Sequence, residues 1–257
     1  MAVKVFLLGC PGSGKSTAAR YMIKFAYKRA CPTAHLYDYK ILHSWFMWEM
    51  RNSENGHKYF SRKKPRGFDV KDFSVLPRAL EEIEKQAQIE ISCGRELILI
   101  EFARDYYSDV LKTFSSDFLC NAYFLFFDAD IETCIKRVHE RSLHPITSYD
   151  HFVSDEIMRS YYGKDNRPYM LSQFAQDYNL DNERVTIIDN TGPWVSFMQQ
   201  IKAFMKGLFK QEPNLSCKTS PLSETSSGQC PSFAQDSIKI HEQKHLVSTP
   251  EPIATLT

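Results

Sequence analysis

The stretch that decides the fold is Gly9-Cys10-Pro11-Gly12-Ser13-Gly14-Lys15-Ser16-Thr17, near the start of a 257-residue chain. It fits the phosphate-binding pattern G-x-x-x-x-G-K-[ST], which has mechanical meaning only between a strand and a helix. The mostly apolar run 3–8 before it predicts a buried strand. The run 16–28 after it has apolar residues at helical spacing. The sequence therefore predicts a strand, a glycine-rich loop and a helix in the order that suits polyphosphate.

Each residue type in this loop has a physical role toward a nucleoside triphosphate. Gly12 and Gly14 permit backbone conformations that turn N–H groups inward, and the helix start adds the positive end of its dipole. Lys15 is expected to bridge the terminal phosphates, and the Ser16 hydroxyl to ligate Mg²⁺. The alternative, a glycine turn that binds nothing, explains neither the lysine nor the flanking elements. The predicted nucleotide-binding residues of the loop are Gly9, Pro11, Gly12, Ser13, Gly14, Lys15, Ser16 and Thr17.

Composition is that of an ordinary globular protein, with 43% hydrophobic and 25% charged residues. The formal net charge of +1 gives no general attraction to nucleic acid or membranes. No apolar run approaches the ~20 residues of a membrane span, and the early first strand leaves no room for a signal peptide. The seven cysteines are scattered without a C-x-x-C, which predicts free thiols and argues against a zinc site. We expect a cytoplasmic protein with no membrane partner.

Apolar runs and helical patterns alternate along the rest of the chain. Further strands are predicted at 34–37, 97–100, 122–127 and 185–188, and helices at 41–51, 74–93, 131–142, 155–162 and 194–209. Strands that alternate with helices, each strand nearly all apolar, predict a parallel α/β sheet covered on both faces.

The pattern also predicts the division of the chain. We expect one P-loop domain over residues 1–209, with a helical substrate-side insertion at 41–93 and a lid region at 137–169. From residue 210 onward Ser, Thr, Pro and Gln dominate, and such a segment buries too little apolar surface to offset its ordering entropy. Residues 210–257 are therefore predicted to be a disordered tail.

Polar residues at the strand ends are the candidates for chemistry, because ligands of parallel sheets bind at the carboxyl ends of the strands. Glu101 stands where a carboxylate supports Mg²⁺, and Arg104 where it would reach the transferred phosphoryl group or the acceptor. Asp38 is placed as the general base for an acceptor hydroxyl. The alternative for Glu101 is a strand-end carboxylate without a role, and for Arg104 a surface salt bridge. For Asp38 it is a simple turn residue.

Arginines of the lid region are the candidates for a charge clamp. Arg137 and Arg141 lie one turn apart on a predicted helix and suit capture of developing charge, and Arg159 is a third candidate. A solvated helix face is the alternative. The aromatic group at 45–48 indicates core more than a stacking platform, and the basic run 62–66 suits an anionic acceptor or a solvated loop.

Three pieces of sequence together resemble a known family: the glycine-rich loop, Tyr37-Asp38-Tyr39, and Asp155-Glu156-Ile157-Met158-Arg159-Ser160-Tyr161-Tyr162. They are similar to the kinase domain of polynucleotide 5′-hydroxyl kinases, within the nucleoside-monophosphate-kinase-like group that includes adenylate, gluconate and shikimate kinases. The resemblance spans roughly residues 2–209.

This resemblance implies a P-loop NTPase fold with a five-stranded parallel sheet of order 2-3-1-4-5 and a small helical lid. It implies that Asp38 activates the acceptor hydroxyl, that lid arginines match Arg137, Arg141 or Arg159, and that the loop 189–193 flanks the adenine, with Asn190 binding the nucleotide. Two departures stand out. Residues 101–104 are closer in form to the Glu-Arg-Ser motif of deoxynucleoside kinases, though spaced differently, and no phosphatase segment accompanies the kinase-like part. Nucleic acid is therefore not the favoured acceptor.

We therefore expect an ATP- and Mg²⁺-dependent phosphotransferase that acts on a hydroxyl or phosphate of a small molecule or nucleotide. A polynucleotide 5′-kinase is the runner-up. An alternative of another class is a nucleotide-dependent switch whose tail binds a partner. The sequence holds no N-K-x-D motif of a GTPase and no L-S-G-G-Q motif of a transporter ATPase.

Overall fold

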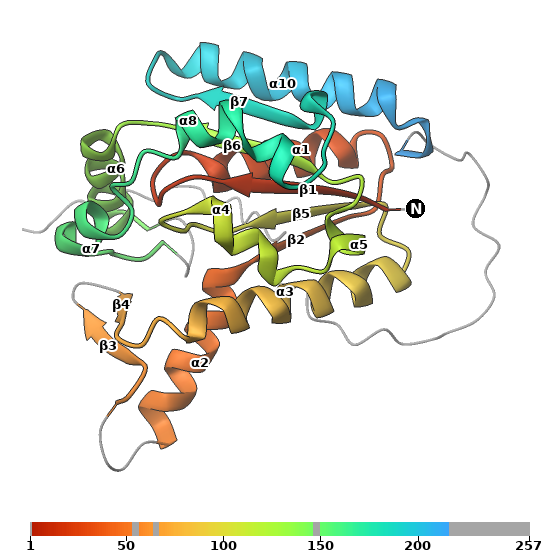
Figure 1. Ribbon diagram of the computed structural model, residues 1–257. Helices are drawn as coiled ribbons and strands as arrows, with labels where there is room; N and C mark the ends of the chain where they lie inside the picture. The colour runs from red at the N-terminus through yellow and green to blue at the C-terminus, as the bar shows by residue number, and fades with distance from the viewer. Residues whose placement is uncertain (1, 53–56, 64–66, 146–149, 216–257) are drawn as a thin grey trace, which may run out of the picture. The chain divides into compact units, whose positions relative to one another are not determined.

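A computed structural model describes residues 2–52, 57–63, 67–145 and 150–215 of the chain (Figure 1). Its centre is a parallel five-stranded sheet of order β2-β5-β1-β6-β7. The strands are β1 (Val3–Leu8), β2 (Thr33–Tyr37), β5 (Leu97–Glu101), β6 (Tyr123–Asp128) and β7 (Val185–Asp189). Counted along the chain without the hairpin strands β3 and β4, this order is 2-3-1-4-5, so the predicted fold class is confirmed.

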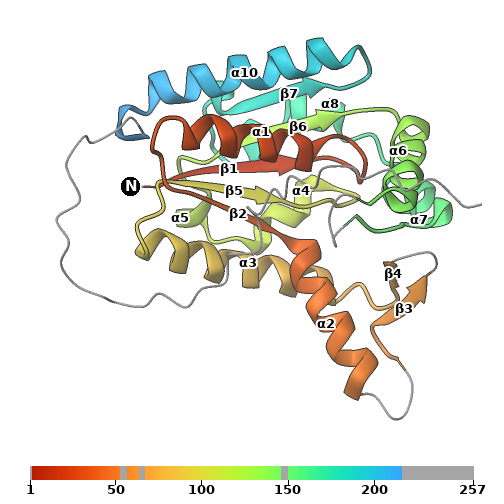
Figure 2. The ribbon, with the colours of Figure 1, turned by 180° about the vertical axis from the view of Figure 1, so that it is seen from behind.

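Helices cover both faces of the sheet (Figures 1 and 2). The helices α1 (Lys15–Tyr27) and α10 (Trp194–Gln211) pack on one face. The other face carries α3 (Val75–Ser92), α4 (Tyr107–Val110), α5 (Ser116–Leu119), α8 (Arg167–Ser172) and α9 (Phe174–Asp177). Side chains of a strand alternate between faces, so in β1 Val5 and Leu7 meet α1 and α10, while Phe6 and Leu8 meet the opposite cluster. This two-sided burial explains why the predicted strands are apolar throughout.

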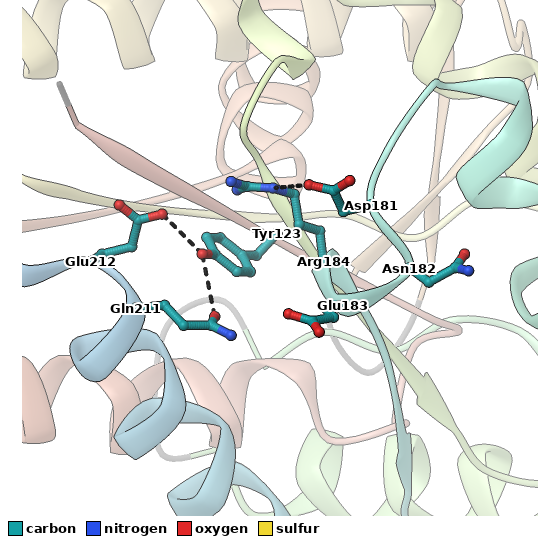
Figure 3. Close-up of a pocket in the computed structure, with 7 residues that line it drawn as sticks. All are labelled: Tyr123, Asp181, Asn182, Glu183, Arg184, Gln211 and Glu212. Atoms are coloured by element: carbon teal, nitrogen blue, oxygen red, sulfur yellow. Dashed lines mark hydrogen bonds and ion pairs between the residues drawn. The ribbon is translucent and has the colours of Figure 1, made fainter.

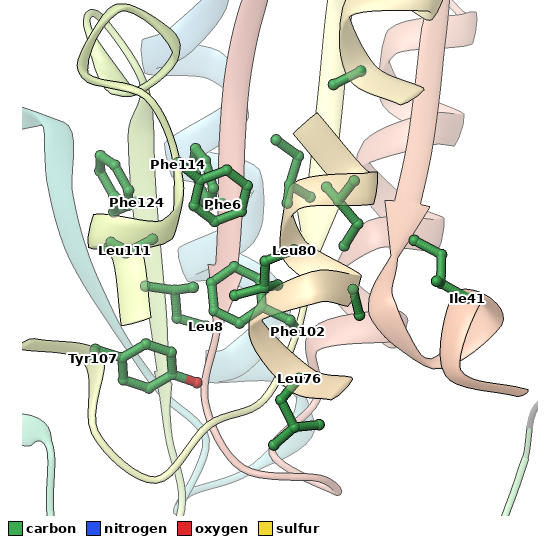
Figure 4. Close-up of a cluster of buried hydrophobic side chains, with 14 of the residues drawn as sticks. Phe6, Leu8, Ile41, Leu76, Leu80, Phe102, Tyr107, Leu111, Phe114 and Phe124 are labelled. Carbon is green, nitrogen blue, oxygen red and sulfur yellow. The ribbon is translucent and has the colours of Figure 1, made fainter. Parts of the chain in front are cut away.

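The cluster on the α3 face is rich in aromatic rings (Figure 4). Phe6 stacks on Phe124 with ring centroids 4.8 Å apart and meets Phe114 edge-on at 5.2 Å. Such rings bury large apolar areas and hold neighbouring elements at fixed distances. The cluster extends to Tyr107, the first residue of α4, at the carboxyl end of β1.

The substrate-side insertion contains a β-hairpin in addition to helices. Helix α2 (Asp38–Asn52) leads to β3 (Phe60–Lys63) and β4 (Gly67–Val70), which pair antiparallel within the insertion that the sequence predicted to be helical. Buried Glu49 anchors the hairpin, since its carboxylate accepts three backbone N–H bonds from residues 58–60. Phe46 packs on buried hairpin rings, which confirms that this part of the aromatic group 45–48 belongs to the core. Residues 64–66 of the basic run lie outside the described residues.

The predicted lid region, 137–169, begins within α6 (Ile131–Leu143) and includes α7 (Asp155–Ser160) and the start of α8. Helices α6 and α7 share a small apolar cluster that includes Cys134, Val138 and Met158. Helices α8 and α9, which were not predicted, follow α7 and return the chain to the sheet through Met170 and Phe174. Short 3₁₀ turns at Leu111–Thr113, Asn182–Arg184 and Pro213–Leu215 complete the described elements.

The C-terminal end of the domain lies beyond the predicted boundary at residue 209. Helix α10 continues to Gln211, and Leu215 is 1% exposed in the cluster beneath α1 and α10. The Tyr123 hydroxyl also donates to Glu212 at 2.9 Å. The packed domain therefore reaches Leu215, and the remainder of the predicted tail, 216–257, lies outside the described residues. Among the described helices, none has the length and apolar character to cross a membrane.

Candidate functional site

The glycine-rich loop occupies residues 9–14, between the end of β1 and the start of α1, as predicted. Gly9, Gly12 and Gly14 all have positive φ, at +136°, +85° and +106°. A Cβ on Gly9 would lie 2.6 Å from the Phe127 carbonyl oxygen, and one on Gly12 would lie 2.5 Å from that of Cys134. Glycine is therefore required at both positions by backbone conformation and by space.

Lys15 is buried at the first turn of α1 and is held by the loop itself. Its Nζ donates to the carbonyl oxygens of Gly9 at 2.7 Å and Cys10 at 2.8 Å. Burial lowers the pKa of Lys15, while the charge of Glu101 acts in the opposite direction. The ammonium group is thus already placed over the loop, where the phosphates of a bound nucleotide would accept its hydrogen bonds.

Ser16 and Glu101 form the predicted metal-supporting pair. The Ser16 hydroxyl donates to Glu101 Oε1 at 2.5 Å, and His35 Nε2 lies 3.0 Å from Oε2. Burial acts to raise the pKa of Glu101, but the hydrogen bond and charge of His35, together with Lys15, hold it at about 2. Glu101 is therefore a carboxylate at neutral pH, and Mg²⁺ at this place would take the Ser16 hydroxyl and phosphate oxygens, with Glu101 behind a water. Within the described ranges, no three His, Cys, Asp or Glu side chains cluster as a metal site of their own.

Asp38 and Arg104 form a buried ion pair beside this loop. The strand register explains their position, because Tyr37 pairs with Glu101, which pairs in turn with Leu7, so three strand ends lie side by side. The Arg104 guanidinium donates to Asp38 Oδ2 and, through Nη2, to a carbonyl oxygen of α3 at 3.0 Å. Arg104 is 4% exposed and Asp38 8%, so the alternative of a surface salt bridge does not fit. Burial raises the pKa of Asp38, and the charge of Arg104 opposes this shift.

Arg137 and Asn190 both bind the backbone of the loop. Arg137 donates to the carbonyl oxygens of Gly12 at 3.4 Å and Asn190 at 3.2 Å. The Asn190 side chain donates to the Ser13 carbonyl at 2.8 Å and is 7% exposed. In the described structure the contact of the Asn190 amide is therefore with the loop, and its binding to the nucleotide stays a prediction.

One buried nitrogen of Arg141 has capacity for an anion. Its Nε is buried with no hydrogen-bond partner among the described residues, and the same holds for the Ser13 hydroxyl within the loop. Burial lowers the pKa of Arg141, while Glu101 and Asp150 oppose that shift. Buried polar atoms without partners are costly, and a bound polyphosphate would satisfy such groups. The residues present therefore fit a nucleoside triphosphate.

Arg159 lies elsewhere, at the surface of the lid region. Its guanidinium makes two bonds to Glu132, at 3.2 and 2.7 Å, and one to Asp155 at 3.4 Å. The side chain is 50% exposed. These contacts join α7 to α6, so the structure does not bring Arg159 together with the other predicted residues. The cause is its place on α7, one turn from Asp155 and facing the acidic first turn of α6.

Tyr107 is a site residue that sequence reasoning missed. It is 1% exposed, and its hydroxyl accepts the N–H of Gly9 at 2.7 Å and that of Arg104 at 3.4 Å. Its own N–H donates to the side chain of Asn166 at 3.3 Å. The segment around Tyr107 has no motif and no long periodic pattern, so no signal in the sequence pointed to it. It links the start of the loop to the strand end that carries Arg104.

Aromatic side chains lie next to Asp38, where the insertion meets the segment before α7. Tyr39 stacks between Phe68 of β4, at 5.4 Å, and His151 of the segment before α7, at 3.6 Å between ring centroids. Close packing of Gly67 on the Phe152 carbonyl brings the same two segments together. The insertion and the lid region therefore meet beside Asp38.

A cavity of about 520 Å³ lies at the other end of the sheet (Figure 3). Figure 3 shows the Tyr123 hydroxyl bonded to Gln211 and Glu212, with Arg184 beside Asp181, at the amino ends of β6 and β7. A smaller cavity of about 200 Å³ lies beside the glycine-rich loop and is lined in part by Cys10, Arg104 and Tyr107. Ligands of parallel sheets bind at the carboxyl ends, so we place the functional site at the loop despite the larger volume elsewhere.

Strand order and loop geometry define this protein as one with a P-loop NTPase fold. No protein-family model matches the sequence, and no curated protein matches it. Among solved structures, a gluconokinase from Sinorhizobium meliloti 1021 is 15% identical, covers 81% of this chain and 96% of its own, and has a TM-score of 0.44. A shikimate kinase from Acinetobacter baumannii is 10% identical over 82% of this chain and 96% of its own, with a TM-score of 0.41. The Pnkp1/Rnl/Hen1 RNA repair complex is 20% identical over 62% of this chain and 42% of its own, with a TM-score of 0.38. Because these identities and TM-scores are low, the assignment of the fold rests on the strand order and the glycine-rich loop of this chain.

Proposed function

We propose that this protein is an ATP- and Mg²⁺-dependent phosphotransferase that acts on a hydroxyl or phosphate group of a small molecule or nucleotide. The observation that carries the proposal is the buried Asp38–Arg104 pair beside the glycine-rich loop. The charges of Lys15 and Glu101 both act on Asp38, so the carboxylate lies within the electrostatic environment of the phosphate site. A nucleotide switch has no need of a buried carboxylate at this place, whereas a kinase needs a base there.

Each residue then has a defined task. Lys15 binds the β- and γ-phosphates, and Ser16 with Glu101 would hold Mg²⁺, which neutralises phosphate charge. The acceptor hydroxyl passes its proton to Asp38 as its oxygen bonds to the γ-phosphorus, and the bond to the β-phosphate oxygen breaks to leave ADP. Arg104 orients the Asp38 carboxylate through their ion pair. Arg141 stabilises the charge that develops on the transferred group.

The acceptor side supports a small acceptor over a polynucleotide strand. Tyr161 and Tyr162, at the end of α7, act electrostatically on Arg104, and Tyr162 also on Asp38. The stacked Tyr39 and His151 join the insertion to the segment before α7 on the same side. Elements from both sides of Asp38 thus suit closure around a compact molecule and exclusion of water from the transfer. A cytoplasmic location remains part of this proposal.

The first test separates binding from chemistry. Terminally labelled ATP is offered with pooled metabolites, nucleotides and 5′-hydroxyl oligonucleotides to find the acceptor. Lys15→Ala should then abolish nucleotide binding with the fold retained, because it removes the charge that contacts two phosphates. Unchanged affinity in Lys15→Ala would reject the nucleotide site.

The second test addresses the base. Asp38→Asn should leave ATP affinity within a few-fold and reduce single-turnover transfer by about 10²–10⁴-fold. Since burial raises the pKa of Asp38, the wild-type rate should fall as the pH drops through a pKa above the ordinary 3.8, and the Asn variant should lack this pH dependence. Asp109→Asn, at an exposed carboxylate, is the matched control. Transfer at the wild-type rate in Asp38→Asn would contradict the role of Asp38 as the base. Slow ATP hydrolysis that no acceptor changes would favour the alternative of a nucleotide-dependent switch.

A further inference from the structure

Two cysteines lie in contact where the glycine-rich loop meets the lid helix. Cys10, the second residue of the loop, and Cys134 of α6 have Sγ atoms 2.9 Å apart, although 124 residues separate them. Cys134 is fully buried and Cys10 is partly exposed. The Gly12 backbone packs so closely on the Cys134 carbonyl that α6 rests directly on the loop. Of the five cysteines in the described ranges, these two form the thiol pair.

The surroundings give the two thiols different reactivity. The hydrogen bond with Cys134 lowers the pKa of Cys10, and the positive charges of Lys15 and Arg137 add to this effect against the opposing effect of burial. The same hydrogen bond and burial raise the pKa of Cys134. Thiolates are the nucleophiles of cysteine chemistry, and oxidation follows thiolate character and access. Cys10 also lines the 200 Å³ cavity beside the loop, which provides that access.

We propose that Cys10 and Cys134 are a reversible redox site, at which a hydroperoxide joins the glycine-rich loop to α6 by a disulfide. The Cys10 thiolate attacks hydrogen peroxide, its O–O bond breaks, and Cys10 becomes a sulfenic acid as hydroxide leaves. The Cys134 thiol loses its proton to that hydroxide and attacks the Cys10 sulfur. The S–S bond forms, and the second hydroxide leaves with a solvent proton as water. In total, two thiols and one peroxide give one disulfide and two waters.

The disulfide would couple the redox state to nucleotide binding. An S–S bond of ~2.05 Å requires the two sulfurs to approach by about 0.9 Å. Helix α6 carries Arg137 and Arg141, and the Cys10 carbonyl holds Lys15, so drawing the two sulfurs together shifts the loop and the lid helix from the arrangement that places these charges. A loop displaced in this way should bind and turn over nucleotide poorly.

The chemical part is tested by mapping thiols in the full-length protein. The reduced protein is titrated with hydrogen peroxide, free thiols are alkylated, and peptides are analysed by mass spectrometry. We expect a Cys10–Cys134 crosslink at peroxide doses that leave the exposed Cys93 and Cys120 alkylatable, and its loss with dithiothreitol. Cys134→Ser should abolish the crosslink, and Cys93→Ser should retain it. Oxidation of Cys93 and Cys120 before any Cys10–Cys134 crosslink would overturn the proposal.

The functional part is tested by ATP titration of the reduced, oxidised and re-reduced protein. We expect the crosslinked form to bind ATP on the order of tenfold more weakly, with full recovery on reduction. A complete crosslink that leaves ATP affinity unchanged would overturn the regulatory role. Neither measurement depends on the identity of the acceptor, so failure here is distinguishable from failure of the proposed phosphotransferase activity.

Discussion

Tyr107→Phe is the most specific test of how the glycine-rich loop is held. The substitution removes one oxygen and leaves the ring in its buried cluster, so no apolar contact is lost. It deprives the Gly9 N–H of an acceptor at 2.7 Å and the Arg104 N–H of a weaker one at 3.4 Å. A buried donor left without a partner costs about 1–3 kcal/mol. For a domain of this size, each kcal/mol lowers the melting temperature by about 2–4 °C.

The measurement is urea denaturation of Tyr107→Phe and wild type, with equal m-values as the sign that only stability has changed. Tyr106→Phe is the matched control: the neighbouring hydroxyl belongs to a half-exposed side chain, and its loss should stay within about 0.5 kcal/mol. ATP affinity should fall in Tyr107→Phe and remain in the control, because the loop begins at Gly9. A Tyr107→Phe protein as stable as wild type would refute the idea that this hydroxyl fixes the loop.

Three further predictions follow from the same geometry. Arg141→Ala should lower turnover by about 10²-fold with a smaller effect on ATP affinity. The matched control, Arg159→Ala at a surface ion pair, should change turnover and ATP affinity by a few-fold at most. Equal losses of turnover in the two variants would contradict a special role of Arg141. Glu101 has a folded pKa of about 2 against an ordinary 4.5, so it should contribute up to about 3 kcal/mol of stability above pH 4.5. That contribution should disappear as the pH falls from 4.5 to 2, and denaturation of Glu101→Gln should show a correspondingly flatter acid limb. Removal of residues 216–257 should leave the melting temperature and turnover unchanged. Removal of residues 211–257 should lower the free energy of unfolding by about 2 kcal/mol or more, because it deletes the buried Leu215. A large loss of stability on removal of 216–257 alone would show that the tail packs on the domain.

The sheet could be predicted from sequence because its strands are buried on both faces. Such strands appear as continuous apolar runs, and the glycine-rich loop fixes which of them comes first. Helices α4, α5, α8 and α9 were not predicted, since four to six residues are too few to show helical periodicity. The hairpin β3–β4 escaped notice for the same reason: each strand has four residues, and charged side chains interrupt the apolar alternation.

The candidate site was predictable where a residue's backbone position determines its neighbours. Asp38, Glu101 and Ser16 lie close together because three strand ends and a helix start share one edge of the sheet. Side-chain direction was not predictable. Arg159 turns to Glu132 and Asn190 to the loop, and no pattern of spacing distinguishes those contacts from contacts with a ligand.

The contacts around the loop separate two kinds of arginine within the predicted clamp. Five carbonyl oxygens of the loop accept protein hydrogen bonds, those of Gly9, Cys10, Gly12, Ser13 and Gly14. With these acceptors occupied, the loop presents N–H donors to an incoming anion, and little ordering is left to oppose binding. Arg137 is one of the groups that hold this arrangement, so we expect its loss to act mainly on nucleotide affinity. Arg141 has a buried Nε without a partner among the described residues, so under the proposed function we expect its loss to act mainly on the chemical step.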